Sequence, residues 1–131
     1  MDAIGLNVRN IYVLAFDDAR GATAVEFAIV GPLFIALVVG IIYLCMCLFA
    51  IGSLHYAVEE GARCASVRTT VCTGDTSIIS YAKSRYFGPG LPTFTYAAAA
   101  CGNAVTGSLN FGVQLVFEQV TVPITSTACF P

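Results

Sequence analysis

The sequence predicts a membrane-anchored α+β protein. A long amino-terminal transmembrane helix is expected to continue into a small extracytoplasmic domain with a second helix and a three-stranded antiparallel sheet. Three observations support this fold class. Residues 27–54 are 28 consecutive positions without Asp, Glu, Lys or Arg, more than the roughly 20 residues that a membrane-spanning helix needs. The chain is 57% apolar and 11% charged, unlike a soluble domain. Two of its six cysteines lie within the charge-free stretch, and the other four all follow it.

The first predicted element is one long helix from about Ala22 to Ser66. Residues 22–54 form its transmembrane part, and an apolar stripe at helical spacing continues beyond the bilayer. The chain therefore divides into a cytoplasmic leader (1–21), a transmembrane helix (22–54) and a disulfide-stapled extracytoplasmic α+β domain (55–131). The stripe consists of Ile51, Leu54, Val58, Ala62 and Ala65, with Glu59 and Arg63 expected to pair on the other side.

The cysteines decide the predicted orientation. Lys and Arg residues are balanced on the two sides of the apolar stretch, so the positive-inside rule does not choose. An even number of cysteines in a small domain is typical of disulfides in an oxidising compartment, which places the carboxyl-terminal domain outside the cytoplasm. The four are Cys64, Cys72, Cys101 and Cys129. Cys45 and Cys47 lie within the apolar helix and are expected to be small apolar packing residues.

A second helix and three strands are predicted in the outer domain. Asp75 is a suitable N-cap for a helix that ends near Tyr86. Alternating apolar residues predict strands over 93–98, 109–117 and 120–124. Pro123 makes the third an edge strand. In an up-down-up meander the first and third strands end on the same side, which favours the disulfide pairs Cys64–Cys72 and Cys101–Cys129.

No catalytic, metal or cofactor site is predicted. The chain has one histidine, His55, which we expect to pack at the membrane exit of the helix, and one imidazole cannot supply a His-containing metal set. The net charge is -2 and the six Lys and Arg residues are scattered, so nucleic-acid binding has no electrostatic support. Non-enzymatic function is the expectation.

Glu26 is the most informative single residue of the apolar half. It is a carboxylate at the mouth of a charge-free helix, where an ionised side chain is expensive and calls for a partner. Cleavage between Gly21 and Ala22 would create one, because the new ammonium group of Ala22 would lie four residues before Glu26 on the same helical face.

The motif of Gly21, four residues, Glu26 and then Phe27 resembles the type III cleavage site of prepilins. Residues 20–34 resemble more closely the TadE-like family, the pseudopilins or minor pilins of tight-adherence (Flp-type, type IVb) pili. The resemblance implies a membrane-held subunit in pilus assembly for surface adherence. It also implies, as partners, a prepilin peptidase, an inner-membrane assembly platform, an assembly ATPase, the major Flp pilin and other minor pilins.

An alternative remains open at this stage. An uncleaved single-span scaffold or accessory binding protein of the envelope would show the same apolar helix and the same cysteines. Both interpretations place the protein in the bacterial inner membrane as a single-pass protein, and the pilin interpretation adds the pilus as a second location. The amino-terminal residue of the protein in membranes distinguishes the two.

Overall fold

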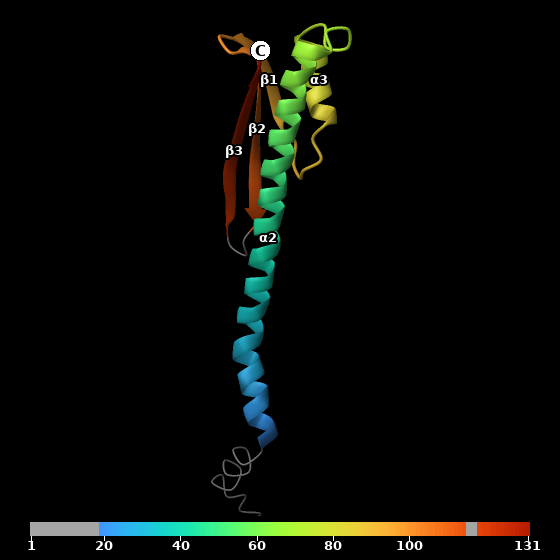
Figure 1. The fold of residues 1–131 in the computed structure, drawn as a ribbon. Helices are drawn as coiled ribbons and strands as arrows, with labels where there is room; N and C mark the ends of the chain where they lie inside the picture. The colour runs from blue at the N-terminus through green and yellow to red at the C-terminus, as the bar shows by residue number, and fades with distance from the viewer. Residues whose placement is uncertain (1–18, 115–117) are drawn as a thin grey trace, which may run out of the picture. The chain divides into compact units, whose positions relative to one another are not determined.

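The computed structural model describes residues 19–114 and 118–131. The fold class is as predicted: a long apolar helix, a second helix and a three-stranded antiparallel sheet follow one another along the chain (Figure 1). The elements are α2 (Ala19–Val67), α3 (Asp75–Ser84), β1 (Thr93–Ala99), β2 (Gly102–Gln114) and β3 (Gln119–Phe130). The expected leader falls largely on residues outside those described. The chain divides into two compact units, residues 1–41 and 42–131.

The first unit contains the amino-terminal half of α2. Its described side chains have no core to enter: Phe27 is 78% and Leu37 is 57% exposed. In the most apolar 18-residue window of this helix only 6% is buried, whereas the core helix of a soluble protein would be mostly buried. The helix is long and apolar enough to cross a membrane. Pro32 lies inside it, a position that membrane helices tolerate.

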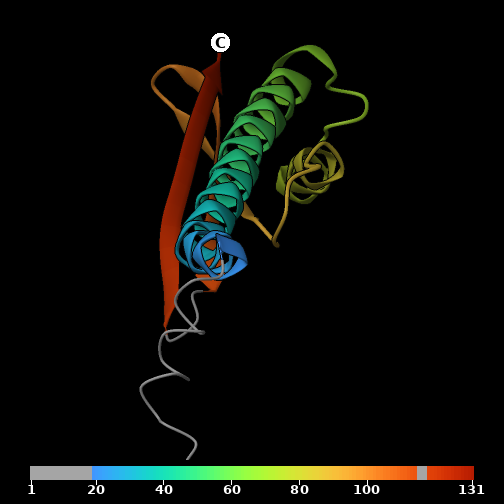
Figure 2. The ribbon, with the colours of Figure 1, turned by 90° about the horizontal axis from the view of Figure 1, so that it is seen from below.

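The second unit is built around the carboxyl-terminal half of α2. The sheet and α3 both pack against this part of the helix (Figure 2). Small residues allow the close approach: a Cβ at Gly61 of α2 would lie 3.0 Å from Ala82 of α3 and 3.5 Å from Val105 of β2. The buried core combines the three layers: Ala50, Leu54, Ala57, Val58, Ala62, Cys64, Cys72, Ile78, Ala82, Phe94, Val105, Leu109, Phe111 and Ile124.

The sheet is the predicted meander in the order β1-β2-β3, with both pairs antiparallel. Gly107 in the centre of β2 pairs with Phe94 on one side and Ser126 on the other. Because β2 is the central strand, Pro123 lies in an edge strand as expected. Strand β2 begins earlier and strand β3 ends later than the apolar pattern indicated, since their small and polar residues are also held by backbone pairing. Residues 115–117 of the predicted second strand lie outside the described residues.

Two details of the helices differ from the prediction. Ile51 is 43% exposed, and the inward stripe instead starts at Ala50, which is fully buried. The N-cap of α3 is Gly74 rather than Asp75, which becomes the first helical residue, and the helix ends at Ser84. Asp75 still carries its charge in the first turn, where it faces the positive end of the helix dipole.

The segment after α3 is anchored to α2 by a buried hydroxyl. Ser53 is 9% exposed, and its Oγ accepts hydrogen bonds from the backbone N–H groups of Phe87 (2.8 Å) and Gly88 (2.9 Å). The Tyr86 hydroxyl donates to the carbonyl of Pro89 at 2.6 Å, and burial raises the pKa of this phenol. The turn that leads into β1 is therefore fixed by polar contacts as well as by packing.

Candidate functional site

The predicted processing residues lie together at the amino-terminal end of α2. Gly21, Ala22 and Glu26 are all helical, so Ala22 and Glu26 are separated by about one helical turn. Glu26 is exposed, and a Cβ at Gly21 would meet no atom within 4 Å. Other parts of the described chain therefore do not cover the Gly21 position.

The chemistry available at this end of the helix is that of a single carboxylate beside a long apolar surface. After Glu26 the next Asp, Glu, Lys or Arg side chain along α2 is Glu59. In an apolar environment a carboxylate is stable only when it is paired or protonated. Its useful partner is a cation, and cleavage before Ala22 is the chemical step that would supply one on the same helix.

Both disulfides expected from the sequence are present. Cys64 and Cys72 join the end of α2 to the segment before α3, with Cα atoms 5.9 Å apart. Cys101 and Cys129 join the β1–β2 turn to β3, with Cα atoms 6.2 Å apart. Cys45 and Cys47 are free thiols. Cys47 packs partly against the core, as expected, but Cys45 is exposed.

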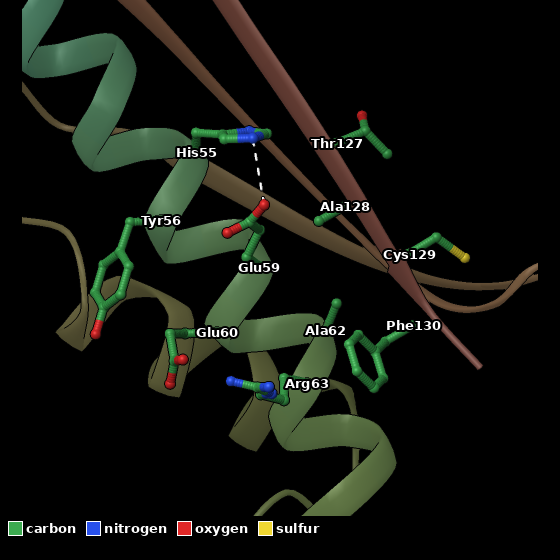
Figure 3. A pocket seen from close by; sticks show the side chains of 10 residues that line it. All are labelled: His55, Tyr56, Glu59, Glu60, Ala62, Arg63, Thr127, Ala128, Cys129 and Phe130. Atoms are coloured by element: carbon green, nitrogen blue, oxygen red, sulfur yellow. Dashed lines mark ion pairs between the residues drawn. The ribbon is translucent and has the colours of Figure 1, made fainter.

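A groove of about 590 Å³ lies between α2 and the edge strand β3 (Figure 3). His55 joins its two sides: Nδ1 lies 2.9 Å from the Ser126 hydroxyl, and Nε2 lies 3.3 Å from a carboxylate oxygen of Glu59. His55 was expected to be packed and Glu59 to pair with Arg63. Both expectations are wrong, because the His55 side chain is 59% exposed and the Arg63 guanidinium lies 5.8 Å from the Phe130 ring centroid.

The row of Ser126, His55 and Glu59 has the residue types of a hydrolytic triad but not its environment. The side chains of His55 and Glu59 are 59% and 58% exposed, so water screens the pair, and such exposed pairs stabilise by only about 0–1 kcal/mol. A catalytic carboxylate is instead buried, so that it can orient and stabilise the imidazolium. We therefore assign the His55–Ser126 contact to joining α2 to β3, and the His55–Glu59 pair lies within α2.

A second polar cluster surrounds the Tyr81 hydroxyl. It accepts hydrogen bonds from Arg68 at 3.1 Å and Arg85 at 3.0 Å, and it lies 3.5 Å from Glu60. Donation of this hydrogen bond to Tyr81 raises the pKa of the Arg85 guanidinium, which also lies 4.9 Å from the Tyr81 ring centroid. The cluster connects the carboxyl-terminal end of α3 to Glu60 of α2 and to Arg68 in the turn after α2. Among the residues described, no group of three His, Cys, Asp or Glu side chains could hold a metal ion.

The sequence did not predict either polar cluster. His55 and Ser126 are 71 positions apart, and Ser66 and Asn103, whose side chains meet at 3.0 Å, are 37 apart. No local pattern connects such residues. The only available signal was the polarity of His55 and Ser66 on an otherwise apolar helix, which indicated that a polar partner was needed but not which one.

Comparison with known proteins bears on the amino-terminal half. A family model described as TadE-like protein matches residues 21–63. No curated protein and no solved structure matches the chain. The match begins at the glycine of the cleavage-type motif and ends one residue before the first disulfide cysteine. Over residues 21–63, which include Gly21, Glu26 and most of α2, the chain therefore matches the TadE-like family, as the motif around Glu26 predicted.

Proposed function

We propose that this protein is a non-enzymatic TadE-like pseudopilin or minor pilin that acts in the assembly of tight-adherence pili for surface adherence. One observation carries the proposal. The Gly21-to-Glu26 motif stands at the head of an apolar helix whose side chains are exposed, and this segment matches the TadE-like family. A match to the TadE-like family connects the chain with Tad pilus function generally. The specific role and partners are our inference.

The proposed location is the bacterial inner membrane. Residues 1–21 lie in the cytoplasm, α2 crosses the bilayer once, and the disulfide-stapled domain lies outside. Prepilin peptidase cleaves between Gly21 and Ala22, which leaves Ala22 as the new amino terminus. Its ammonium group pairs with Glu26, within the helix or in a neighbouring subunit.

The proposed mechanism is an exchange of neighbours around α2. In the membrane the exposed apolar side chains contact lipid. During assembly, on the inner-membrane platform, they contact the equally apolar helices of the major Flp pilin and other minor pilins. Lipid tails and apolar helices are similar in polarity, so packing and polar contacts direct the association. The Ala22 ammonium and Glu26 provide one such polar contact and fix the register.

Intact-mass analysis of the protein from membranes of cells with an active prepilin peptidase tests the proposal. We expect a mature species that begins at Ala22. Gly21→Leu should remain as the full-length precursor because a bulky side chain occupies the scissile position. The control is Gly40→Leu, the same change at another glycine of α2 with open space around it, which should still be processed. A wild-type protein found only at full length would instead favour the uncleaved scaffold.

A further inference from the structure

We propose that the outer domain rests directly on the membrane surface and that the end of the β2–β3 hairpin contacts lipid headgroups. The contact surface, the hairpin foot, consists of Val113, Gln114, Gln119, Val120 and Val122, together with Phe49 and Ile51 of α2. The proposal rests on the proposed membrane span of α2. It moves the point where the helix leaves the hydrocarbon from the end of the charge-free stretch at Leu54 to about Cys47.

Helix length gives the first argument. A hydrocarbon core of roughly 30 Å is crossed by roughly 20 helical residues at about 1.5 Å each. Glu26 is the last acidic or basic residue before the apolar stretch and belongs at the boundary. Counted from Phe27, about 20 residues reach Met46 or Cys47. The seven residues from Leu48 to Leu54 therefore carry no charged side chain but lie beyond the core of the bilayer.

The packing of the second unit independently indicates that the helix leaves the hydrocarbon near Cys47. Cys47 is partly buried against the domain core, and Ala50 is fully buried. These residues cannot face lipid on that side, because protein covers them. The compact unit that contains the sheet begins at Ile42. The folded domain thus starts within the stretch that sequence alone assigns to the membrane.

The direction of β2 shows which part of the domain lies at this level. Val105 lies beside Gly61, whereas Gly107 lies beside Leu54 and Val58, so β2 runs antiparallel to α2. Two strand residues advance about 6.8 Å, which corresponds to four or five helical residues. Phe111 therefore lies near the level of Cys47, and the last part of β2 lies alongside the amino-terminal part of this half of α2 (Figure 1).

Backbone chemistry excludes hydrocarbon as the surroundings of this hairpin. Strand β3 is an edge strand, and unpaired N–H and C=O groups on an edge cost several kcal/mol each in lipid tails. The last described pair of the β2–β3 ladder is Gln114 with Gln119, and Glu118 next to it is exposed. Amide and carboxylate side chains suit the hydrated headgroup layer. The bilayer must therefore end where the hairpin begins.

The exposed apolar side chains of the foot favour lipid over bulk water. Phe49 is 53%, Ile51 43%, Val120 44% and Val122 39% exposed. Phe49 and Ile51 belong to the charge-free stretch that runs from Phe27 to Leu54. An apolar surface that is continuous with a membrane span and lies at the height of the headgroups is occupied by the interfacial part of the bilayer.

Single-tryptophan fluorescence tests the proposal, because the chain contains no tryptophan. The full chain is reconstituted in vesicles of phosphatidylethanolamine and phosphatidylglycerol. Val122→Trp and Val120→Trp report on the foot, and Leu37→Trp reports on the span. Ala100→Trp, exposed at the opposite end of β2 in the β1–β2 turn, is the matched control. We expect both foot probes to be blue-shifted relative to Ala100→Trp, quenched by lipids brominated near the headgroup, and protected from acrylamide.

The outcomes separate this proposal from the one on which it rests. If Leu37→Trp is quenched by lipids brominated deep in the tails while both foot probes respond to acrylamide like Ala100→Trp, the span stands and the headgroup contact is wrong. If Leu37→Trp is not quenched by brominated lipid, the membrane span itself fails. Two different foot positions guard against local misfolding of either variant.

Discussion

The pilin and scaffold interpretations assign different roles to Glu26. In the precursor it lies one to two turns inside α2, which has no acidic residue in its first turn. Cleavage before Ala22 would shorten the helix, so that Glu26 would then lie in the first turn, close to the new ammonium group. In the proposed pilin, the function of the carboxylate would therefore be coupled to processing.

We predict that Glu26→Ala and Glu26→Gln leave the amount of protein in the membrane unchanged, because they remove a costly charge from the lipid boundary. Assembly should fail, since an ammonium group left unpaired in an apolar interface costs about 1–3 kcal/mol. Complementation of a deletion strain for piliation and adherence measures this. Glu26→Asp, which keeps the charge, is the control and should retain part of the function.

A simpler role for Glu26 predicts a different result. Stabilisation of the helix dipole alone is worth about 0.3–1 kcal/mol, too little to abolish assembly. Full complementation by Glu26→Ala would therefore contradict the pairing and leave only this dipole effect.

Gly107 is the residue on which packing of the outer domain most depends. A Cβ there would lie 2.8 Å from Leu54, 2.9 Å from Val58 and 3.0 Å from Phe94. Leu54 and Val58 are fully buried and have no room to move. The glycine thus permits the close contact between β2 and α2.

We predict that Gly107→Ala lowers the free energy of unfolding of the outer domain by about 1–3 kcal/mol, the usual cost of overpacking a core. The control is Gly112→Ala in the same strand, where the added Cβ would meet only the end of the flexible Gln119 side chain. Denaturant unfolding followed by near-ultraviolet circular dichroism measures both variants. Equal stability of the two would show that the helix–sheet contact adjusts freely.

At the scale of elements, each of the two disulfides joins two parts of the outer domain covalently. One closes the turn between α2 and α3, and the other closes the end of the sheet. A domain of this size gains no more than about 3–5 kcal/mol from its core alone. Covalent links are therefore a large share of its stability.

Removal of each disulfide should have a graded effect. Loop-closure entropy gives about 3.5 kcal/mol for Cys101–Cys129 and about 2.5 kcal/mol for Cys64–Cys72, because the sequence separations are 28 and 8 residues. The paired Cys→Ser variants are compared by thermal unfolding in the same detergent. The larger loss should follow removal of Cys101–Cys129, and the reverse order would mean that loop length does not govern the stabilisation.

The helices and strands also show which parts of the fold local sequence patterns could predict. The long apolar run predicted α2 to within a few residues, because helical periodicity is a local property. The first half of β2 was missed: Asn103 and Gly107 are not typical strand residues. Pairing with β1 and β3 on both sides holds this segment extended, and tertiary context overrides weak β-propensity.

At the scale of the whole molecule, the proposed topology has a chemical signature in the thiols. An oxidising compartment would leave only Cys45 and Cys47 reduced, whereas the cytoplasm would keep all six cysteines reduced. The oxidation state of the chain in cells therefore reports on which side of the membrane the outer domain folds.

We predict that a maleimide-polyethylene glycol reagent, added to cells denatured in acid to trap thiols, shifts the protein by two additions and not six. The measurement is the mobility on a denaturing gel, and prior reduction provides the six-addition standard. Cys45→Ser should remove one addition without affecting the disulfides. Six additions without reduction would place the domain in the cytoplasm and contradict the proposed topology.

The sequence by itself determined the class of the molecule, the length of α2, the order of the strands and the disulfide pairs. These follow from composition, from periodicity and from the geometry of a meander, all of which are visible over short stretches. It also determined the resemblance to TadE-like proteins, because the motif around Gly21 and Glu26 is contiguous.

Only the tertiary structure decided where the outer domain begins and what its polar residues contact. Ala50 replaced Ile51 in the core because the sheet approaches α2 from one particular direction, which periodicity alone does not fix within about one residue. His55 met Ser126 across 71 positions, and Gly107 met Leu54 and Val58. Such contacts depend on how β2 lies along the helix, and that is set by the combined packing of three layers rather than by any local segment.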